Sequence, residues 1–210
     1  MADGVMKTAA RRLGVFGGNF DPVHIGHLVA AQDACEEMEL DEVVFMPAAL
    51  APLRNVKPFL DDAQRMALLQ AAIADDPRFA VSTLEIDRGG VSYSIDTARA
   101  LAALHPSTDL FWIIGSDQAQ QLASWKDIEA LGGLVEFIVL ARPGSPFPDS
   151  TTAFARLHTV NAHLMNISST EIRERLVANK PVRHFLPATV AGLIDCGNLY
   201  RPSVHAQENH

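Results

Sequence analysis

GGNFDPVHIGHL, residues 17–28, is the stretch that decides the fold of this chain. A short apolar run, residues 13–16, precedes it, and a helical pattern of apolar residues at 25–38 overlaps its end. The run predicts a buried strand that ends at the two glycines. Because open parallel sheets bind nucleotides at such strand-to-helix turns, the stretch predicts an anion site in an α/β fold.

Two histidines in this stretch, His24 and His27, are expected to share one face of the first helical turn. Gly17 and Gly18 let backbone amides approach phosphate oxygens, and the helix N-terminus favours the same anion. The imidazoles can donate hydrogen bonds to oxygens that gain charge when a phosphorus atom is attacked. An isolated pair of this spacing is more often structural or part of a metal site. The adjoining Asp-Pro and glycine favour phosphate chemistry, and no third ligand has a zinc-like spacing.

Strand and helix patterns alternate along the rest of the chain. Further strands are expected at residues 43–46, 79–84, 110–114, 135–140 and 158–160, and further helices at 61–74, 96–104, 168–178 and 187–195. Such alternation predicts a parallel sheet with helices on both faces. With no internal repeat and no linker, the chain is expected to form a single domain, 1–210, with a Rossmann-like doubly wound sheet. Its core should span about residues 13–200 between flexible ends.

Charge and composition narrow the class of function. The chain has 17 basic and 25 acidic residues, a net charge of −8, which disfavours nucleic acid as a partner. Cys35 and Cys196 are far apart and suggest no disulfide framework, in agreement with a reducing compartment. No apolar run reaches membrane length, and the run after the basic N-terminal residues is too short for a signal peptide. We therefore expect a cytoplasmic protein without a membrane partner.

A second motif, ISSTEIR, occupies residues 167–173. Ser168 and Glu171 have the spacing of a capping box at a helix start. The hydroxyls of Ser168, Ser169 and Thr170, the free backbone amides and the guanidinium of Arg173 could converge on an anion there. On its own, the motif is more often an ordinary capped amphipathic helix. Together with the first motif, it predicts a second half of the phosphate site.

The two motifs, about 140 residues apart, resemble those of the HIGH-motif nucleotidyltransferase superfamily. GGNFDPVHIGHL is similar to its GxFxPxHxGH signature, and ISSTEIR to its ISSTxIR pattern. That superfamily includes bacterial pyridine-nucleotide adenylyltransferases, pantetheine-phosphate adenylyltransferase and class I aminoacyl-tRNA synthetases. Other segments resemble nicotinate-nucleotide adenylyltransferases: SYSIDT at residues 92–97, the turn Gly115-Ser116-Asp117, the aromatic Trp125 and Arg142-Pro143-Gly144. The resemblance covers roughly residues 13–200.

The resemblance implies an activity in NAD biosynthesis, the transfer of AMP from ATP to nicotinate mononucleotide, which gives nicotinate adenine dinucleotide and pyrophosphate. It implies catalytic roles for His24, His27 and Arg173. The residues expected to bind ATP are Gly17, Gly18, Phe20, His24, Gly26, His27, Asp117 (at the ribose), Ser168, Ser169, Thr170 and Arg173. Those expected to bind the acceptor are Asn19, Arg54, Ser94, Trp125, Lys126 and Arg142. Mg²⁺ is expected to enter with ATP, and no metal site made by the protein alone is expected.

One departure from the family pattern and several alternatives stay open. Where the family has Pro-His-Lys, this chain has Pro52-Leu53-Arg54, so Arg54 or Lys57 is expected to supply the positive charge. Asp96 and Asp117 could instead be helix caps, and Trp125 a core aromatic. The acceptor could be nicotinamide mononucleotide or phosphopantetheine. The acidic charge and the length of the chain disfavour a tRNA synthetase fragment. A non-catalytic nucleotide sensor on the same fold is a further alternative, and it would differ from the enzyme by releasing no pyrophosphate from ATP. The sequence does not decide whether identical chains assemble.

Overall fold

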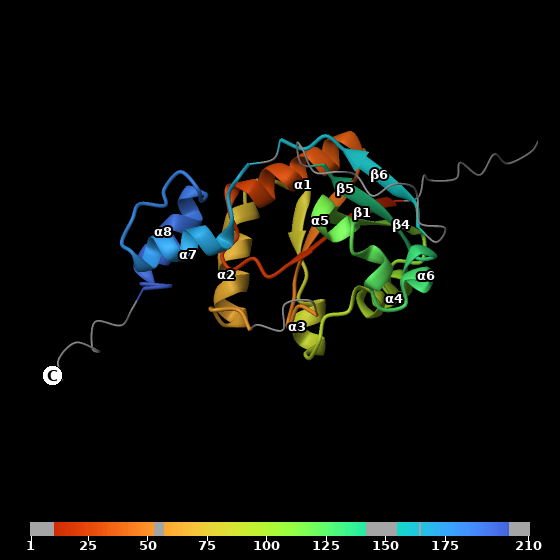
Figure 1. The fold of residues 1–210 in the computed structure, drawn as a ribbon, viewed down its shortest axis with the longest axis horizontal. Coiled ribbons are helices and arrows are strands. Elements are labelled where there is room, and N and C mark those ends of the chain that lie inside the picture. Colours follow the sequence, from red (N-terminus) through yellow and green to blue (C-terminus); the bar gives the residue numbers. More distant parts are fainter. Residues whose placement is uncertain (1–10, 53–56, 142–154, 164, 202–210) are drawn as a thin grey trace, which may run out of the picture.

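The fold is a parallel sheet covered by helices on both faces (Figure 1). A computed structural model describes residues 11–52, 57–141, 155–163 and 165–201. The expected positions of Arg54 and Arg142, and the ends expected to be flexible, lie outside these residues. No helix in the described part of the chain has the length and apolar character needed to cross a membrane.

Six strands form one sheet in the order β3-β2-β1-β4-β5-β6, and every neighbouring pair is parallel. The strands are β1 (Arg11–Gly18), β2 (Glu42–Pro47), β3 (Phe79–Val81), β4 (Thr108–Gly115), β5 (Val135–Leu140) and β6 (Leu157–Val160). The chain builds outward from β1 to β3 and then returns to the other side of β1 with β4. This reversal is the doubly wound topology expected from the sequence.

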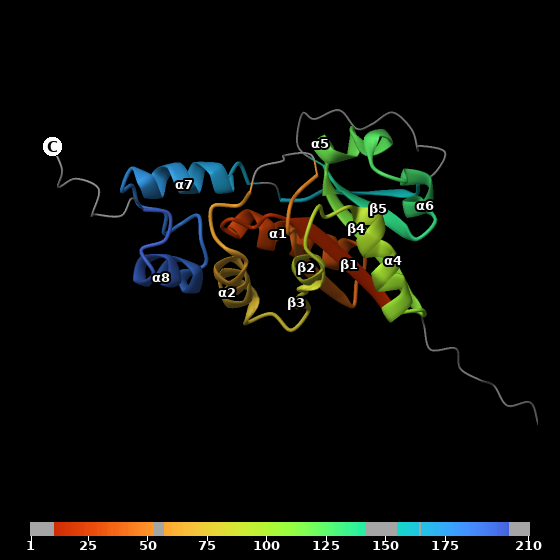
Figure 2. The ribbon, with the colours of Figure 1, turned by 90° about the horizontal axis from the view of Figure 1, so that it is seen from below.

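The helices pack on the two faces through two separate hydrophobic clusters. They are α1 (Ile25–Glu37), α2 (Asp62–Ile73), α3 (Leu84–Arg88), α4 (Ser94–Leu104), α5 (Ser116–Ala119), the 3-10 turn η1 (Leu122–Ser124), α6 (Ile128–Gly132), α7 (Ser169–Val177) and α8 (Ala188–Cys196). Side chains of α1, α2, α7 and α8 join one cluster, and those of α4 and α6 join the other. In Figure 2, α4 and α6 lie away from α1 and α2.

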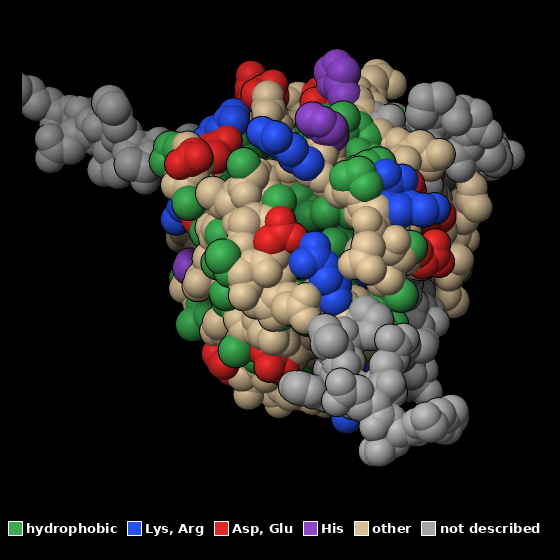
Figure 3. All heavy atoms as spheres, turned by 90° about the vertical axis from the view of Figure 1, so that its left-hand side faces the viewer, with side chains coloured by type: hydrophobic (Ala, Val, Ile, Leu, Met, Phe, Trp, Pro, Cys, Tyr) green, Lys and Arg blue, Asp and Glu red, His purple; other side chains and the backbone are tan. Residues whose placement is uncertain are grey.

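The last two helices form one end of the molecule, beside α2 (Figure 1). The hydroxyl of Thr189 on α8 donates to the carbonyl of Ala71 on α2 at 2.8 Å. Figure 3 looks onto this end, where hydrophobic side chains lie between acidic and basic ones. A cavity of about 550 Å³ there is lined by α7, α8 and the chain around them, including Leu176, Val182 and Gly192. Its lining contains none of the residues expected to bind a nucleotide.

Most expected elements are confirmed, but two boundaries are corrected and two short helices are added. β1 does not end at the glycines, because Gly17 and Gly18 pair with Met46 and Pro47 of β2. The strand expected at 79–84 stops at Val81, since this edge strand pairs only with β2, over three residues, and α3 follows at Leu84. The short helices α3 and α6 were not expected from the sequence. With five residues each, they are too short for a helical period to show.

Helix starts follow local side-chain chemistry. Asp61 caps α2, and its carboxylate accepts a hydrogen bond from the Gln64 amide at 2.8 Å, as expected. Ser168 caps α7 in the same way, by accepting from the Glu171 amide at 3.1 Å. α4 begins at Ser94 with Tyr93 as N-cap, so the alternative that Asp96 caps this helix is wrong.

Candidate active site

The expected phosphate turn lies at the carboxyl end of β1, beside β4, where the order of strands reverses. Ligands of doubly wound sheets bind at this switch point. A Cβ atom at Gly17 would meet no atom within 4 Å, so open space adjoins this backbone. At Gly18 a Cβ would lie 3.1 Å from the Phe20 ring. Gly17 therefore leaves room for a ligand, whereas Gly18 makes room for the protein's own turn.

Phe20 anchors the turn that follows. Its backbone is left-handed, with φ of 47°, and the whole residue is 2% exposed. The ring packs edge-on against Phe16, His27 and Phe45, with centroids 5.8, 5.1 and 5.5 Å away. The side chain of Phe20 thus belongs to the core and is not positioned to contact a nucleotide. The peptide bond between Asp21 and Pro22 is cis.

The two histidines form one stacked unit at the start of α1. His24 is the N-cap, and its ring lies 3.6 Å from that of His27, with 23° between the planes. The backbone N–H of His24 donates to Nδ1 of His27 at 3.2 Å. Since Nδ1 accepts this bond, a neutral His27 carries its proton on Nε2. Nδ1 of His24 is buried and has no hydrogen-bond partner among the described residues.

Burial sets the charge of both rings. It lowers the pKa of His24 to about 4, and it lowers the pKa of His27 well below the usual value, with His24 as a second cause. Both imidazoles are therefore neutral at pH 7. A neutral ring with its proton on Nε2 can donate a hydrogen bond to a phosphate oxygen without losing that ability when the pH rises.

The second motif folds back onto the first. The hydroxyl of Ser169 donates to the Pro22 carbonyl at 2.8 Å, across 147 residues of sequence. Nη1 of Arg173 donates to the Asp21 carbonyl at 2.6 Å, and Nη2 donates to the Thr170 hydroxyl at 3.1 Å. The start of α7 and the turn before α1 therefore form one surface, as the sequence predicts.

The carboxyl end of β4 brings a third element to this edge of the sheet. Asp117 lies in the first turn of α5, directly after β4, and is exposed. A Cβ at Gly115 would lie only 2.5 Å from Oδ1 of Asp117, so a side chain there would push the Asp117 carboxylate from this position. Because β1 and β4 are parallel neighbours, Asp117 and Gly17 lie at the same edge of the sheet, and the ribose contact of Asp117 stays a prediction.

Two of the expected acceptor residues, Ser94 and Lys126, lie at the start of α4, whereas Asn19 lies in the turn after β1. Ser94 is the first residue of this helix. Nζ of Lys126 lies 3.2 Å from Oδ2 of Asp96 and 4.2 Å above the Tyr93 ring, so its ammonium already has protein partners. The Trp125 ring packs edge-on against Phe137 at 6.2 Å. Its Nε1 is buried, without a hydrogen-bond partner among the described residues.

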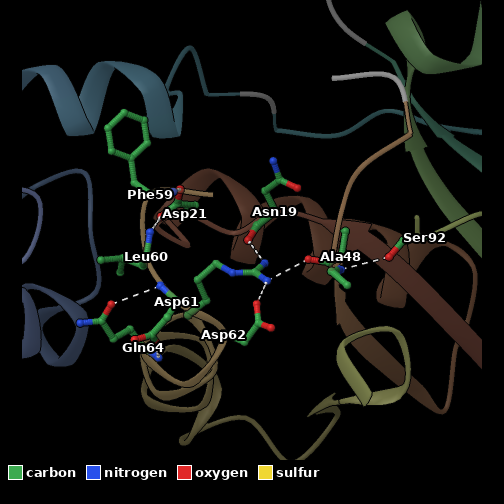
Figure 4. Close-up of polar contacts among 11 residues, drawn as sticks. Asn19, Asp21, Ala48, Phe59, Leu60, Asp61, Asp62, Gln64 and Ser92 are labelled. Carbon is green, nitrogen blue, oxygen red and sulfur yellow. Dashed lines mark hydrogen bonds and ion pairs between the residues drawn. The ribbon is translucent and has the colours of Figure 1, made fainter. Parts of the chain in front are cut away.

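Asp21 organises the first turn, a role that the local sequence did not predict. Its carboxylate accepts hydrogen bonds from the Phe59 amide at 2.6 Å, the Leu60 amide at 3.4 Å and the Tyr200 hydroxyl at 2.7 Å (Figure 4 shows the first of these partners). Burial and the neighbouring Asp21 raise the pKa of Tyr200, which keeps its hydroxyl protonated and donating. The partners lie up to 179 residues away, so no local pattern could have revealed them.

Arg65 and Glu85 were also missed. Arg65 on α2 is fully buried and donates to backbone carbonyls of the first two strand-to-helix loops. One signal could have found it, because Leu68 and Leu69 lie three and four residues later and mark the buried face of α2. Glu85 on α3 is also buried, and this burial raises its pKa. It accepts a hydrogen bond from the Thr97 hydroxyl at 2.7 Å, beneath the start of α4.

A doubly wound parallel sheet with a histidine pair at its first helix, facing a capped helix with an arginine, defines a nucleotidyltransferase. The sequence profile of the family described as Cytidylyltransferase-like matches residues 15–175. A probable nicotinate-nucleotide adenylyltransferase of Opitutus terrae is 46% identical over 193 residues, covering 91% of this chain and 99% of that protein. A probable nicotinate-nucleotide adenylyltransferase of Thermus thermophilus is 40% identical over 190 residues, covering 90% of this chain and 100% of that protein.

The chain belongs to the nicotinate-nucleotide adenylyltransferase family within this cytidylyltransferase-like group. Solved structures show the same fold at lower identity. Plasmodium falciparum nicotinic acid mononucleotide adenylyltransferase complexed with NaAD superimposes with a TM-score of 0.75 at 20% identity, covering 90% of this chain and 97% of that one. A putative nicotinate-nucleotide adenylyltransferase from Vibrio parahaemolyticus superimposes with a TM-score of 0.68, also at 20% identity, covering 92% of this chain and 97% of that one.

Proposed function

We propose that this enzyme transfers the adenylyl group of ATP to nicotinate mononucleotide and releases pyrophosphate. The observation that carries the proposal is the neutral, stacked pair of His24 and His27 at the start of α1, beside Arg173 of α7. The relatives named as nicotinate-nucleotide adenylyltransferases support the choice of acceptor.

The reaction is an in-line attack by a phosphate oxygen of the acceptor on the α-phosphorus of ATP. A phosphate monoester has a second pKa of about 6, so the attacking oxygen is already ionised at neutral pH. No strong general base is needed, and catalysis depends on alignment and on stabilising developing charge. Nε2–H of His27 would donate to an oxygen of the reacting phosphate. His24, the N-cap of the same helix, would contact the phosphates beside it.

α7 would hold the β- and γ-phosphates from the opposite side. Its N-terminus presents free amides and the Thr170 hydroxyl, whose proton stays available because the oxygen accepts from Arg173. The Ser169 hydroxyl, in contrast, donates to the Pro22 carbonyl. Arg173 uses two nitrogen atoms on protein oxygens, and its guanidinium has five N–H donors, so its charge and further donors stay available. The positive charge of Arg173 would stabilise the negative charge that accumulates on the β- and γ-phosphates as pyrophosphate leaves.

The acceptor would lie against the start of α4, with its pyridine ring near Trp125. The N-terminus of this 11-residue helix favours a carboxylate over a neutral amide. This preference is the physical reason to favour nicotinate mononucleotide over nicotinamide mononucleotide. Ser94 would contact the ring substituent, and Asp117 would contact the ribose of ATP.

Mg²⁺ would enter with the ATP phosphates. Magnesium is usually held by substrate phosphates, water and at most one or two carboxylates. In the described part of the chain, no three of His, Cys, Asp and Glu gather as a protein-only metal site would need. The residues present fit a metal carried by the nucleotide, which would supply charge neutralisation on the phosphates. The cytoplasmic location and the oligomeric state stay predictions.

The test is pyrophosphate release from ATP with Mg²⁺, with nicotinate mononucleotide, nicotinamide mononucleotide and phosphopantetheine offered separately. We expect strong preference for the nicotinate compound. His27→Ala should lower kcat by about tenfold or more while circular dichroism stays unchanged. The matched control is His105→Ala, which alters an exposed histidine at the far end of α4 and should change kcat by less than about twofold. If none of the three acceptors leads to pyrophosphate release, the result would support a nucleotide sensor instead.

A further inference from the structure

The guanidinium of Arg65 joins the two loops that follow β1 and β2. Its Nη1 donates to the carbonyl of Asn19 and its Nη2 to the carbonyl of Ala48, both at 2.8 Å. Nη2 also lies 2.6 Å from Oδ1 of Asp62. The side chain is fully buried, which is rare for arginine and requires such pairing. In Figure 4, dashed lines join the Asn19 carbonyl, the Ala48 carbonyl and the Asp62 carboxylate to one guanidinium group.

These two bonds fix the directions of two backbone amides. In a trans peptide the carbonyl and the following N–H point in opposite directions. Holding the Asn19 carbonyl on Arg65 therefore turns the Phe20 N–H away from Arg65. Within the described residues, no hydrogen bond uses the Phe20 N–H. This donor lies in the turn between Gly18 and His24, and the described part of the chain supplies no acceptor for it.

The second bond reaches the acceptor side of the site. Since the Ala48 carbonyl faces Arg65, the Ala49 N–H faces the other way and donates to the Ser92 hydroxyl at 3.0 Å (Figure 4). The Ser92 N–H in turn donates to the Leu50 carbonyl at 2.9 Å. Ser92 lies two residues before Ser94, the start of α4. Arg65 is thus connected both to the phosphate turn before α1 and to the segment that leads into α4, and its own side chain is buried away from the proposed substrates.

We propose that Arg65 is a positioning residue, which orients the Phe20 amide for a phosphate oxygen and holds the start of α4 in register with the phosphate turn. This inference rests on the proposed adenylyl transfer. Lysine cannot replace it, because one ammonium group cannot span two carbonyls and a carboxylate with the planar geometry of a guanidinium. A displacement of about 1 Å in such a turn is enough to slow an aligned reaction severely.

The test compares Arg65→Lys with two controls. Arg65→Lys should lower kcat by about tenfold or more in a protein that stays folded by circular dichroism. Thr189→Val removes another hydrogen bond to α2, far from the loops, and should lower the melting temperature while kcat stays within about twofold. Asp62→Asn removes the exposed partner but leaves both carbonyl bonds, so its kcat should also stay within about twofold. Arg65→Lys kinetics equal to those of the wild type would overturn the proposal.

Two further measurements keep the test decisive. If Arg65→Lys does not fold, Ser92→Ala reports on the same connection, and its KM for nicotinate mononucleotide should rise while its KM for ATP stays unchanged. An unchanged KM for both substrates would overturn the proposal. Direct binding of ATP, measured by calorimetry, needs no turnover and should weaken in Arg65→Lys but not in Thr189→Val. A wild type that binds ATP but releases no pyrophosphate refutes the proposed function alone.

Discussion

The neutral histidine pair makes the stability of the fold depend on pH in a direction that can be worked out. His24 is 6% exposed, and burial lowers its pKa to about 4 in the folded protein. In the unfolded chain its pKa is about 6.5. Between these values the unfolded state binds a proton that the folded state does not bind. The free energy of unfolding therefore falls as the pH drops from above 6.5 toward 4.

The size of the effect follows from the same two values. Between pH 7 and pH 5, linkage assigns His24 a loss of roughly 2 kcal/mol of unfolding free energy. We expect His24→Asn to abolish this contribution, because asparagine does not titrate and is a favourable N-cap for α1. Glu85, whose raised pKa acts in the opposite direction, is present in both proteins and cancels from the comparison.

Urea unfolding of the wild type and of His24→Asn, each at pH 7 and pH 5, measures this contribution. The wild type should lose about 2 kcal/mol more than the variant over this interval. His27 stays in the variant, and burial, the larger cause of its lowered pKa, stays with it. If the two proteins lost the same free energy to within about 0.5 kcal/mol, the assignment of a neutral, buried His24 would be refuted.

Two substitutions separate ligand space from packing and hydrogen bonding. Gly17→Ala should leave the unfolding free energy unchanged, because its Cβ meets no atom within 4 Å, yet raise the KM for ATP about fivefold or more. Its control is Gly14→Ala, which puts a Cβ 2.7 Å from Leu40. This control should lower the free energy of unfolding by about 1–3 kcal/mol and leave the KM for ATP unchanged. If the two variants had equal KM values for ATP, the open ligand space at Gly17 would be contradicted. Tyr200→Phe removes a donor to Asp21 and should cost about 1.5–3 kcal/mol, read as a lower melting temperature in calorimetry; an unshifted transition would mean that this bond adds nothing.

Patterns of short range predicted well. The apolar runs of β4 and β5, the capping chemistry of Asp61 and Ser168 and the alternation of strands and helices are all encoded within a few residues. The two motifs were found because each combines glycine, hydroxyl, histidine or arginine side chains in a compact segment. Their joining was expected from resemblance, and the contacts of Ser169 and Arg173 with the first turn show how it occurs.

Features that depend on distant segments were not predictable. β1 continues through Gly17 and Gly18 because β2 supplies hydrogen-bond partners, which overrides the local tendency of glycine to end a strand. The neutral state of His27 depends on burial by the surrounding fold. The same is true of Arg65, whose charge would favour water unless carbonyls from two separate loops met it.

The sequence by itself determined the class of fold, the order of elements and the two motifs that carry phosphate chemistry, because periodicity, capping and turn chemistry act over a few residues. Only the tertiary structure decided which polar groups lose water and which partners replace it. Asp21 illustrates the difference, since its residue type is visible in the motif while its partners Phe59, Leu60 and Tyr200 come from elsewhere in the chain. Desolvation and pairing depend on the whole fold, and they set the charge, direction and rigidity of this site.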